Sequence, residues 1–217
     1  MIFWAACAAG LAIAYLLGAT PTGYLAGKLL KGIDIREHGS KSTGATNVLR
    51  TVGKWPALVV IVGDLLKGVA AILFARWFYP WLATAVTPAF DPHGLTPWAI
   101  CLAGLAALLG HSRSVWLNFT GGKSAATGLG ILLALSWPVG LGTAAAVIAV
   151  LAVTRIVSLA SMLGAVTAMT LILALEQPLA YRLLVIAGGI FVILRHRANI
   201  QRLLSGTEPR IGQSSRV

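Results

Sequence analysis

Charged residues are scarce in this sequence. Asp, Glu, Lys and Arg make up 11% of the 217 residues, whereas hydrophobic residues make up 58%. Soluble domains are typically about half apolar and about a quarter charged. The shortage of charge, with a mean hydropathy of +0.85, therefore excludes an ordinary soluble domain and a disordered chain, and it favours a membrane protein.

Acidic residues are the scarcest of the charged residues. The chain has 6 Asp and Glu against 17 Lys and Arg, which gives a net charge of +11. In a soluble protein this balance would suggest a nucleic-acid partner, but the apolar content argues against one. We therefore expect no nucleic acid to bind, and we expect a small membrane protein whose basic residues lie on one side.

Cysteine and clusters of metal-binding residues are also nearly absent. Cys7 and Cys101 lie in apolar runs without a nearby His, so we expect small buried side chains rather than nucleophiles or ligands. No group of His, Cys, Asp and Glu has metal-ligand spacing, and we expect no metal and no cofactor. The N-terminus lacks the basic start of a signal peptide, so its apolar run is interpreted as a retained span.

Apolar sequence is what the chain has in abundance. A helix needs about 20 apolar residues to cross a bilayer, and shorter runs are also typical of tilted or re-entrant segments. The runs predict an all-α, polytopic membrane protein built as a single domain, residues 1–217. They are Ile2–Leu17, Trp55–Phe78, Pro97–Leu109, Ala125–Trp137, Val139–Val153, Val157–Leu175 and Leu179–Leu194.

The distribution of basic residues predicts the orientation of these runs. Residues 28–54 hold six Lys or Arg and the tail from residue 195 holds five, whereas the linker 79–96 holds none. The positive-inside rule places the loop and the tail in the cytoplasm and the linker outside. A break at Trp137-Pro138 is needed to keep the tail inside. We therefore predict seven transmembrane helices, with the N-terminus outside and the C-terminus inside.

The first cytoplasmic loop, near residues 28–54, is rich in Gly, Ser, Thr and Asn and carries Arg50 near its end. Such a stretch can turn successive backbone N–H groups toward an anion, and a helix beginning at Ala45 would add its N-terminus. The alternative is a polar connecting loop with a helix N-cap at Thr43.

The second loop, near residues 110–127, contains Gly121-Gly122-Lys123-Ser124, which is similar to the end of a Walker A motif. The first Gly of that motif would fall at Leu117, so ATP binding is not inferred. The glycines still permit close approach to a phosphate, and Lys123 supplies positive charge. The alternative for Lys123 is a lysine that extends to the membrane interface.

Two further polar segments lie on the predicted cytoplasmic side, near residues 154–161 and 195–217. His196 and Asn199 are three apart and would share a face on a helix, although an interfacial His and topology-setting arginines are the alternative. Polar, cation-bearing segments that converge at one membrane surface predict a site for a molecule with a phosphate and an apolar tail.

Short motifs in a fixed order identify a family resemblance. The motifs are residues 21–28, 34–40, 44–50, 64–68, 121–127, 155–158 and 196–199. With these motifs in this order, the sequence resembles the bacterial acyl-phosphate-dependent glycerol-3-phosphate acyltransferases of the PlsY type. The resemblance implies seven transmembrane helices in the bacterial inner membrane, an active site facing the cytoplasm, and a monomer.

The resemblance also implies a reaction. A fatty acyl group passes from acyl phosphate to the 1-hydroxyl of sn-glycerol 3-phosphate, which gives lysophosphatidic acid and phosphate, the first acylation of bacterial phospholipid synthesis. The partners are acyl phosphate, sn-glycerol 3-phosphate and membrane lipid. The implied catalytic residues are Lys123, Ser40, Arg50, His196 and Asn199; the implied substrate- and phosphate-binding residues are Gly39, Thr46, Asn47, Gly121, Gly122, Ser158 and His111.

The sequence departs from the family pattern at several positions within these loops. Lys41 and Ser124 stand where glycine is common, Ser114 replaces a common Pro, and Thr120 replaces a common Lys. Lys41 is the departure with the largest expected effect on the shape of the first loop.

No residue pattern identifies a general base. Acyl phosphate is already activated, so the enzyme has only to hold both phosphates, align the hydroxyl and stabilise the oxyanion. None of the His residues has an Asp five positions on, and no Ser-His-Asp set is evident. His111, His196 or an oxygen of the departing phosphate remain as proton acceptors, and we favour the phosphate. Asp64 and Lys67, three apart, are interpreted as a structural ion pair.

Two other functions remain as alternatives. A small anion or phosphate transporter should carry charge near the bilayer midplane, whereas here nearly all charge lies at one surface. A lipid-binding membrane protein without catalysis would not need several Gly/Ser/Lys loops on one face.

Overall fold

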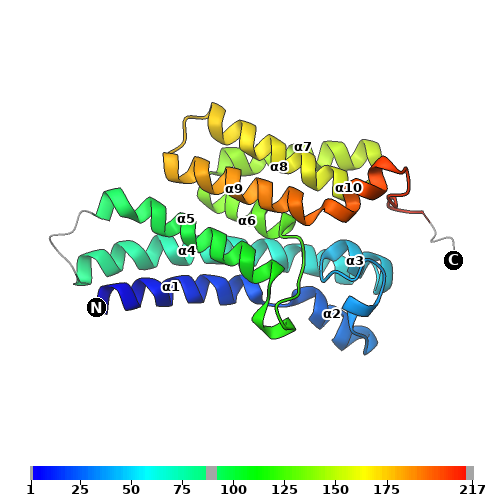
Figure 1. Ribbon diagram of the computed structural model, residues 1–217, viewed down its shortest axis with the longest axis horizontal. Coiled ribbons are helices and arrows are strands. Elements are labelled where there is room, and N and C mark those ends of the chain that lie inside the picture. Colours follow the sequence, from blue (N-terminus) through cyan, green and yellow to red (C-terminus); the bar gives the residue numbers. More distant parts are fainter. Residues whose placement is uncertain (1, 87–91, 214–217) are drawn as a thin grey trace.

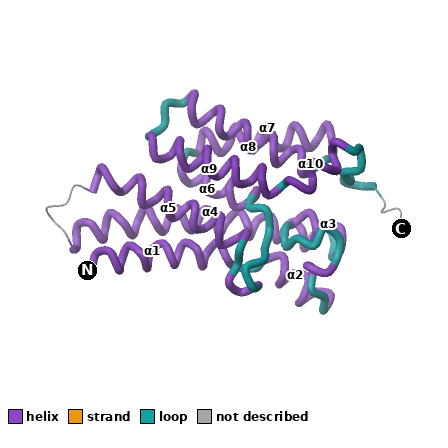
Figure 2. The backbone as a smooth tube through the Cα atoms, viewed as in Figure 1, coloured by secondary structure: helices purple, strands orange, loops and turns teal. Residues whose placement is uncertain are grey.

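A computed structural model describes residues 2–86 and 92–213 of the chain. In this range the protein is helical, and its one β-bridge joins Ser114 and Thr120 (Figure 2). The predicted all-α class is confirmed. The α-helices are α1 (Ile2–Ala19), α2 (Thr22–Lys31), α3 (Ala45–Thr51), α4 (Lys54–Val86), α5 (Pro92–Ser112), α6 (Ala125–Leu135), α7 (Trp137–Thr154), α8 (Val157–Ala174), α9 (Leu179–Arg195) and α10 (Arg197–Leu204), and two 3₁₀ turns span Ile35–Glu37 and Val115–Leu117.

The long helices run side by side along the longest axis of the molecule (Figure 1). Helices α1, α4 and α5 pack against one another, α8 packs against both α7 and α9, and α6 joins the two groups through α4 and α7. Helices α2, α3 and α10 gather at one end of the bundle, on the right in Figure 1. We call this the loop end.

Helix length and composition support a multi-pass membrane protein. Five described helices are long and apolar enough to cross a bilayer, and a sixth candidate is α9 with α10, which are bent by 57°. Helix α6, with 11 residues, is shorter than a full span. Each predicted apolar run corresponds to one helix. The break predicted at Trp137-Pro138 is present one residue earlier, at Ser136, and Trp137 and Pro138 begin α7. The count of seven spans and their orientation stay predictions.

The linker expected at residues 79–96 is largely helical instead. Helix α4 continues through Pro80 to Val86, and α5 begins at Pro92. Intramembrane helices accept proline because neighbouring groups satisfy the freed backbone. Residues 87–91 of this linker, and residues 214–217 of the predicted cytoplasmic tail, lie outside the described part of the chain.

Small residues allow the helices to approach closely. A side chain at Gly68 on α4 would overlap the carbonyl of Thr127 on α6, and one at Gly130 on α6 would overlap the carbonyl of Leu65 on α4. Apolar side chains gain little by leaving lipid, so membrane helices associate through such close backbone contacts. This packing fixes α6 against α4 and so positions the loop that leads into α6.

Candidate active site

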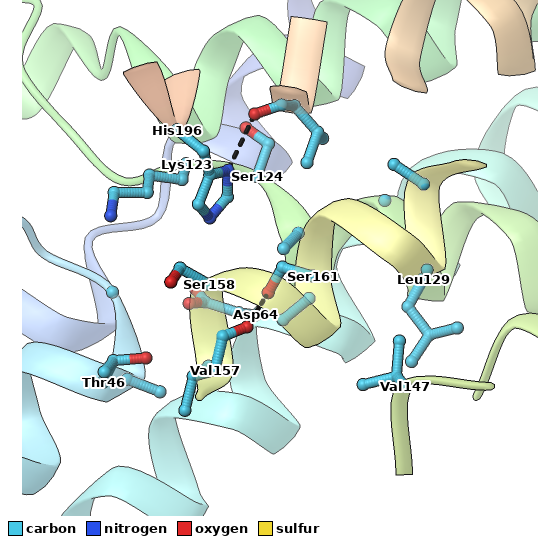
Figure 3. A pocket seen from close by; sticks show the side chains of 18 of the residues that line it. Thr46, Asp64, Lys123, Ser124, Leu129, Val147, Val157, Ser158, Ser161 and His196 are labelled. Carbon is cyan, nitrogen blue, oxygen red and sulfur yellow. Dashed lines mark hydrogen bonds between the residues drawn. The ribbon is translucent and has the colours of Figure 1, made fainter. Parts of the chain in front are cut away.

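A cavity of about 300 Å³ opens at the loop end and continues between the helices. In Figure 3, Thr46, Lys123, Ser158 and His196 lie around one part of this space, and Leu129 and Val147 lie around another. The apolar part is lined mainly by α6, α7, α8 and α9, including Leu132, Leu151, Ala165, Ala168, Leu184, Val185 and Gly188. The cavity is therefore polar at one end and apolar at the other.

The structure brings the predicted site residues together. Segments far apart in the sequence place their side chains around the polar end of the cavity. The predicted glycines 39, 121 and 122 are not among the lining residues and shape the adjoining backbone. The predicted residues that line the cavity are Ser40, Thr46, Asn47, Arg50, His111, Lys123, Ser158, His196 and Asn199.

Lys123 connects the second loop to the C-terminal segment. Its Nζ donates to Oδ1 of Asn199 over 2.6 Å. Burial lowers the pKa of Lys123 to about 8, and the positive charges of Arg50, Arg195 and Arg202 act in the same direction while Glu208 opposes them. A half-buried lysine whose ammonium has one neutral partner retains donors for an anion.

His196 lies between two helices, so the expectation that it shares a helix face with Asn199 is only partly correct. Helix α9 ends at Arg195 and α10 begins at Arg197, and the bend between them turns both His196 and Asn199 toward the cavity. Nδ1 of His196 lies 2.8 Å from the carbonyl oxygen of Val192. A carbonyl only accepts, so Nδ1 carries the proton and Nε2 is the nitrogen left for a substrate.

Glu208 is a cavity residue that the sequence patterns did not identify. Its carboxylate accepts from Ser158 Oγ at 2.7 Å, from Asn199 Nδ2 at 2.6 Å and from Arg202 Nε at 2.7 Å. Burial raises its pKa, but these hydrogen bonds and the charge of Arg202 hold the pKa below its usual value. One feature of the sequence could have pointed to a role for Glu208, since it is the only acidic residue after Arg195.

Asn47 organises the first loop from within. Its Nδ2 lies within hydrogen-bond distance of the carbonyls of Ile35, His38 and Ser42, and its Oδ1 accepts from the backbone N–H of Ser40. An amide has two donor hydrogens and one acceptor oxygen, so little capacity is left for a phosphate. The helix after this loop begins at Ala45 as predicted, but its N-cap is Gly44 and not Thr43.

Two departures from the family pattern fall on left-handed backbone. Lys41 has a φ of 55° and Ser124 has a φ of 65°. Glycine adopts this conformation freely, whereas other residues pay about 1–2 kcal/mol. At Ser124 this conformational cost is offset by hydrogen bonds of its hydroxyl with Ser112 Oγ and the carbonyl of Leu108. Lys41 is exposed and keeps the backbone shape that glycine would give.

The other departures connect the two loops. Thr120 Oγ1 accepts from Arg36 Nη1 at 3.1 Å, and the same nitrogen also donates to the carbonyl of Leu117. Arg36 is held by Asp34 at 2.6 Å, and this guanidinium keeps the pKa of Asp34 below its usual value. Ser114 donates its backbone N–H to Thr120 and its hydroxyl to Ala19, bonds that a proline there would lack.

Arg50 brings a second cation to the polar end. Burial lowers the pKa of Arg50, with Glu208 opposing, yet a guanidinium stays charged at neutral pH. Arg50 and Lys123 reach the cavity from different loops, and hydroxyls of Ser40, Thr46 and Ser158 surround them. This arrangement can hold anionic groups next to an apolar channel.

Comparison with known proteins identifies relatives along nearly the whole chain. A family model described as "Glycerol-3-phosphate acyltransferase" matches residues 8–206. A protein of Rhizobium johnstonii named "Glycerol-3-phosphate acyltransferase 2" is 70% identical over 98% of this chain and 99% of its own length. A Nostoc sp. protein named "Glycerol-3-phosphate acyltransferase" is 54% identical over 98% and 96% of the two chains.

Solved structures show the same fold. The crystal structure of PlsY (YgiH), described as an integral membrane glycerol 3-phosphate acyltransferase in the glycerol 3-phosphate form, has a TM-score of 0.81 and 35% identity. It covers 95% of this chain and 96% of its own. The lysophosphatidic acid form of the same protein has a TM-score of 0.78 and 34% identity, with 95% of each chain covered.

Proposed function

Since the chain belongs to the glycerol-3-phosphate acyltransferase family, we propose that it transfers a fatty acyl group from acyl phosphate to the 1-hydroxyl of sn-glycerol 3-phosphate. It is an acyltransferase of glycerol 3-phosphate and an integral, multi-pass membrane protein. The observation that carries the acyl-phosphate donor is the cavity itself, where a cationic end continues directly into an apolar channel. The alternative of an anion transporter has no support in these relatives.

We assign the two phosphates to different loops. Lys123, bonded to Asn199, is suited to the phosphate of glycerol 3-phosphate, and the unprotonated Nε2 of His196 beside them is suited to accept from a hydroxyl of the same substrate. Arg50, Ser40 and Thr46 then hold the acyl phosphate, whose chain enters the apolar channel. Asn47, Gly39, Gly121 and Gly122 shape the backbone around both anions.

The reaction requires one bond to form and one to break. The 1-hydroxyl oxygen attacks the acyl carbonyl carbon, and the bond from that carbon to the phosphate oxygen breaks. The departing phosphate takes the hydroxyl proton, which balances the step as lysophosphatidic acid and inorganic phosphate. The cations and hydroxyl donors stabilise charge on the phosphates and on the carbonyl oxygen, so no covalent enzyme intermediate is needed.

We further propose that the loop end faces the cytoplasm of a bacterial inner membrane. The basic loops and tail support this orientation through the positive-inside rule. Exposed Trp55 and Trp116 lie near the loop end, and exposed Trp77 and Trp137 lie in the segments next to the opposite end. Tryptophan is enriched at both interfaces of a membrane.

A direct assay tests the reaction. Purified protein in detergent is incubated with palmitoyl phosphate and labelled glycerol 3-phosphate, and lysophosphatidate and phosphate are measured together. We expect both products in equal amounts. Palmitoyl thioesters serve as the control donor. Product from a thioester and none from palmitoyl phosphate would disprove the proposed donor. No product from either donor would disprove the proposed acyltransferase function.

The pKa of Lys123 predicts how activity depends on pH. Because that pKa is about 8, the ammonium loses its proton as the pH rises through about 8, and kcat/KM for glycerol 3-phosphate should fall. The substrate phosphate, with a second pKa of about 6, is already a dianion in this range. Lys123→Arg, which stays charged, should move the decline to higher pH. A decline at the same pH in both proteins would assign it to another group.

Gly188 on α9 lines the apolar channel. We predict that the space beside it limits the length of the acyl chain. A side chain there would meet only the flexible end of Leu108, at 3.1 Å, so a larger residue would extend into the channel. Gly188→Leu should shift the preference from palmitoyl toward lauroyl phosphate by about tenfold in kcat/KM. The control is Ala187→Leu, on the exposed side of the same helix, which should leave the preference unchanged.

A further inference from the structure

A buried charged cluster forms part of the cavity wall, through Asp64 and His111, and is not explained by phosphate binding alone. Asp64 on α4 is 1% exposed, and its Oδ1 accepts from Thr22 Oγ1 at 2.6 Å and from Lys67 Nζ at 2.8 Å. Lys67 also donates to the carbonyl of Thr20 at 3.0 Å, between α1 and α2. The predicted Asp64–Lys67 ion pair is therefore present. Ionisable groups within a membrane bundle are costly and mark functional positions.

His111, at the end of α5, joins this cluster to the second loop. Its Nδ1 lies 3.5 Å from Oδ1 of Asp64, and its ring is buried. A side chain at Gly122 would overlap His111 Nε2, so the imidazole lies directly against the glycine backbone. The backbone N–H of Gly122 also donates to the carbonyl of His111 at 3.1 Å. Asp64 thus contacts His111, and His111 contacts the residue before Lys123.

The remaining contacts of Gly122 show how the His111 imidazole helps to fix the position of the second loop. The carbonyl of Gly122 accepts from Ser112 Oγ at 3.2 Å and from Arg195 Nη2 at 3.1 Å. These bonds hold the Gly122 carbonyl, and the imidazole lies against the Cα of the same residue. Lys123 follows immediately, so a displacement of Gly122 displaces the ammonium. Small displacements of a binding cation cost large factors in affinity and rate.

We propose that His111, oriented by Asp64, is a positioning residue that fixes the Gly121–Lys123 segment for glycerol 3-phosphate, and is not the general base. The inference rests on the proposed function, since it assigns that loop to the glycerol 3-phosphate site. It also gives the Thr22, Asp64 and Lys67 contacts a role, because they hold Asp64 in place beneath His111.

The test compares His111→Ala with His111→Asn in the full-length protein, each normalised to the folded fraction seen by size-exclusion chromatography. The Asn amide N–H occupies a position near that of Nδ1 and keeps the contact with Asp64 but does not reach the place of Nε2 against Gly122, so His111→Asn should keep more activity than His111→Ala. His111→Ala should raise the KM for glycerol 3-phosphate at least tenfold and change kcat and the KM for palmitoyl phosphate less. The matched control is His38→Asn, at an exposed position.

A double variant keeps the test decisive when a single variant folds poorly. Gly122→Ala should raise the KM for glycerol 3-phosphate because its methyl overlaps the imidazole, and combination with His111→Ala should restore part of that loss by making room. Additive losses would overturn the proposal. So would a hundredfold loss of kcat in His111→Asn at unchanged KM, which would identify a base. An inactive wild type would instead refute the proposed function.

Discussion

Lys123→Ala is expected to lower kcat/KM for glycerol 3-phosphate by about a hundred- to a thousandfold. The ammonium is the one cation of the second loop at the cavity, and its partner Asn199 is itself a predicted site residue. Its removal takes away charge that the attacking substrate's phosphate needs in the ground state and in the transition state. The loss should therefore appear as a raised KM together with a lowered kcat, measured in the lysophosphatidate assay.

Matched variants separate this effect from a loss of surface charge. Lys28→Ala removes a lysine from the exposed side of α2, outside the cavity, and should leave kcat/KM unchanged. Lys123→Arg should retain more activity than Lys123→Ala, but less than wild type, because a planar guanidinium does not fit the geometry of a point charge. Full activity in Lys123→Ala would refute the phosphate-binding role of the second loop.

Positions of the helices were predictable because the bilayer imposes a simple length rule. Each apolar run became a helix, and the break before Pro138 was predicted from charge balance. The linker at residues 79–96 was less predictable. Pro80 would end a helix in most soluble proteins, but here it lies inside α4. Local rules of helix termination therefore apply less strictly within a membrane bundle.

The site was predictable where a residue's chemistry shows in its immediate neighbours. Gly121, Gly122 and Lys123 stand together, and their loop reaches the cavity rim. Asn47 was assigned to substrate, and the hydrogen bonds that occupy its amide became visible only when the loop was folded. Glu208 follows a Gly-Thr turn with no motif around it, and its role arises from contacts with α8 and α10 that no local pattern encodes.

Glu208 itself yields the second large prediction. Its side chain is 3% exposed and holds Ser158, Asn199 and Arg202 at once. Glu208→Ala leaves the buried donors of Ser158 and Asn199 without their acceptor, which costs about 1–3 kcal/mol for each, whereas the Arg202 side chain is 37% exposed and can be hydrated. We expect a lower melting temperature and, in the fraction that remains folded, a loss of activity of about a hundredfold, because Asn199 no longer holds its position beside Lys123.

Glu208→Gln and acid titration distinguish the charge from the shape of this side chain. The folded-state pKa of Glu208 is lowered, so its stabilising contribution is present above the unfolded value of about 4.3 and is lost as the pH falls through the folded value. Glu208→Gln should reduce stability at neutral pH and remove this part of the acid dependence. It should keep more activity than Glu208→Ala, since its amide oxygen can still accept from Asn199 or Ser158. Equal loss in both variants would show that the carboxylate charge, and not its acceptor geometry, aligns Asn199 with Lys123.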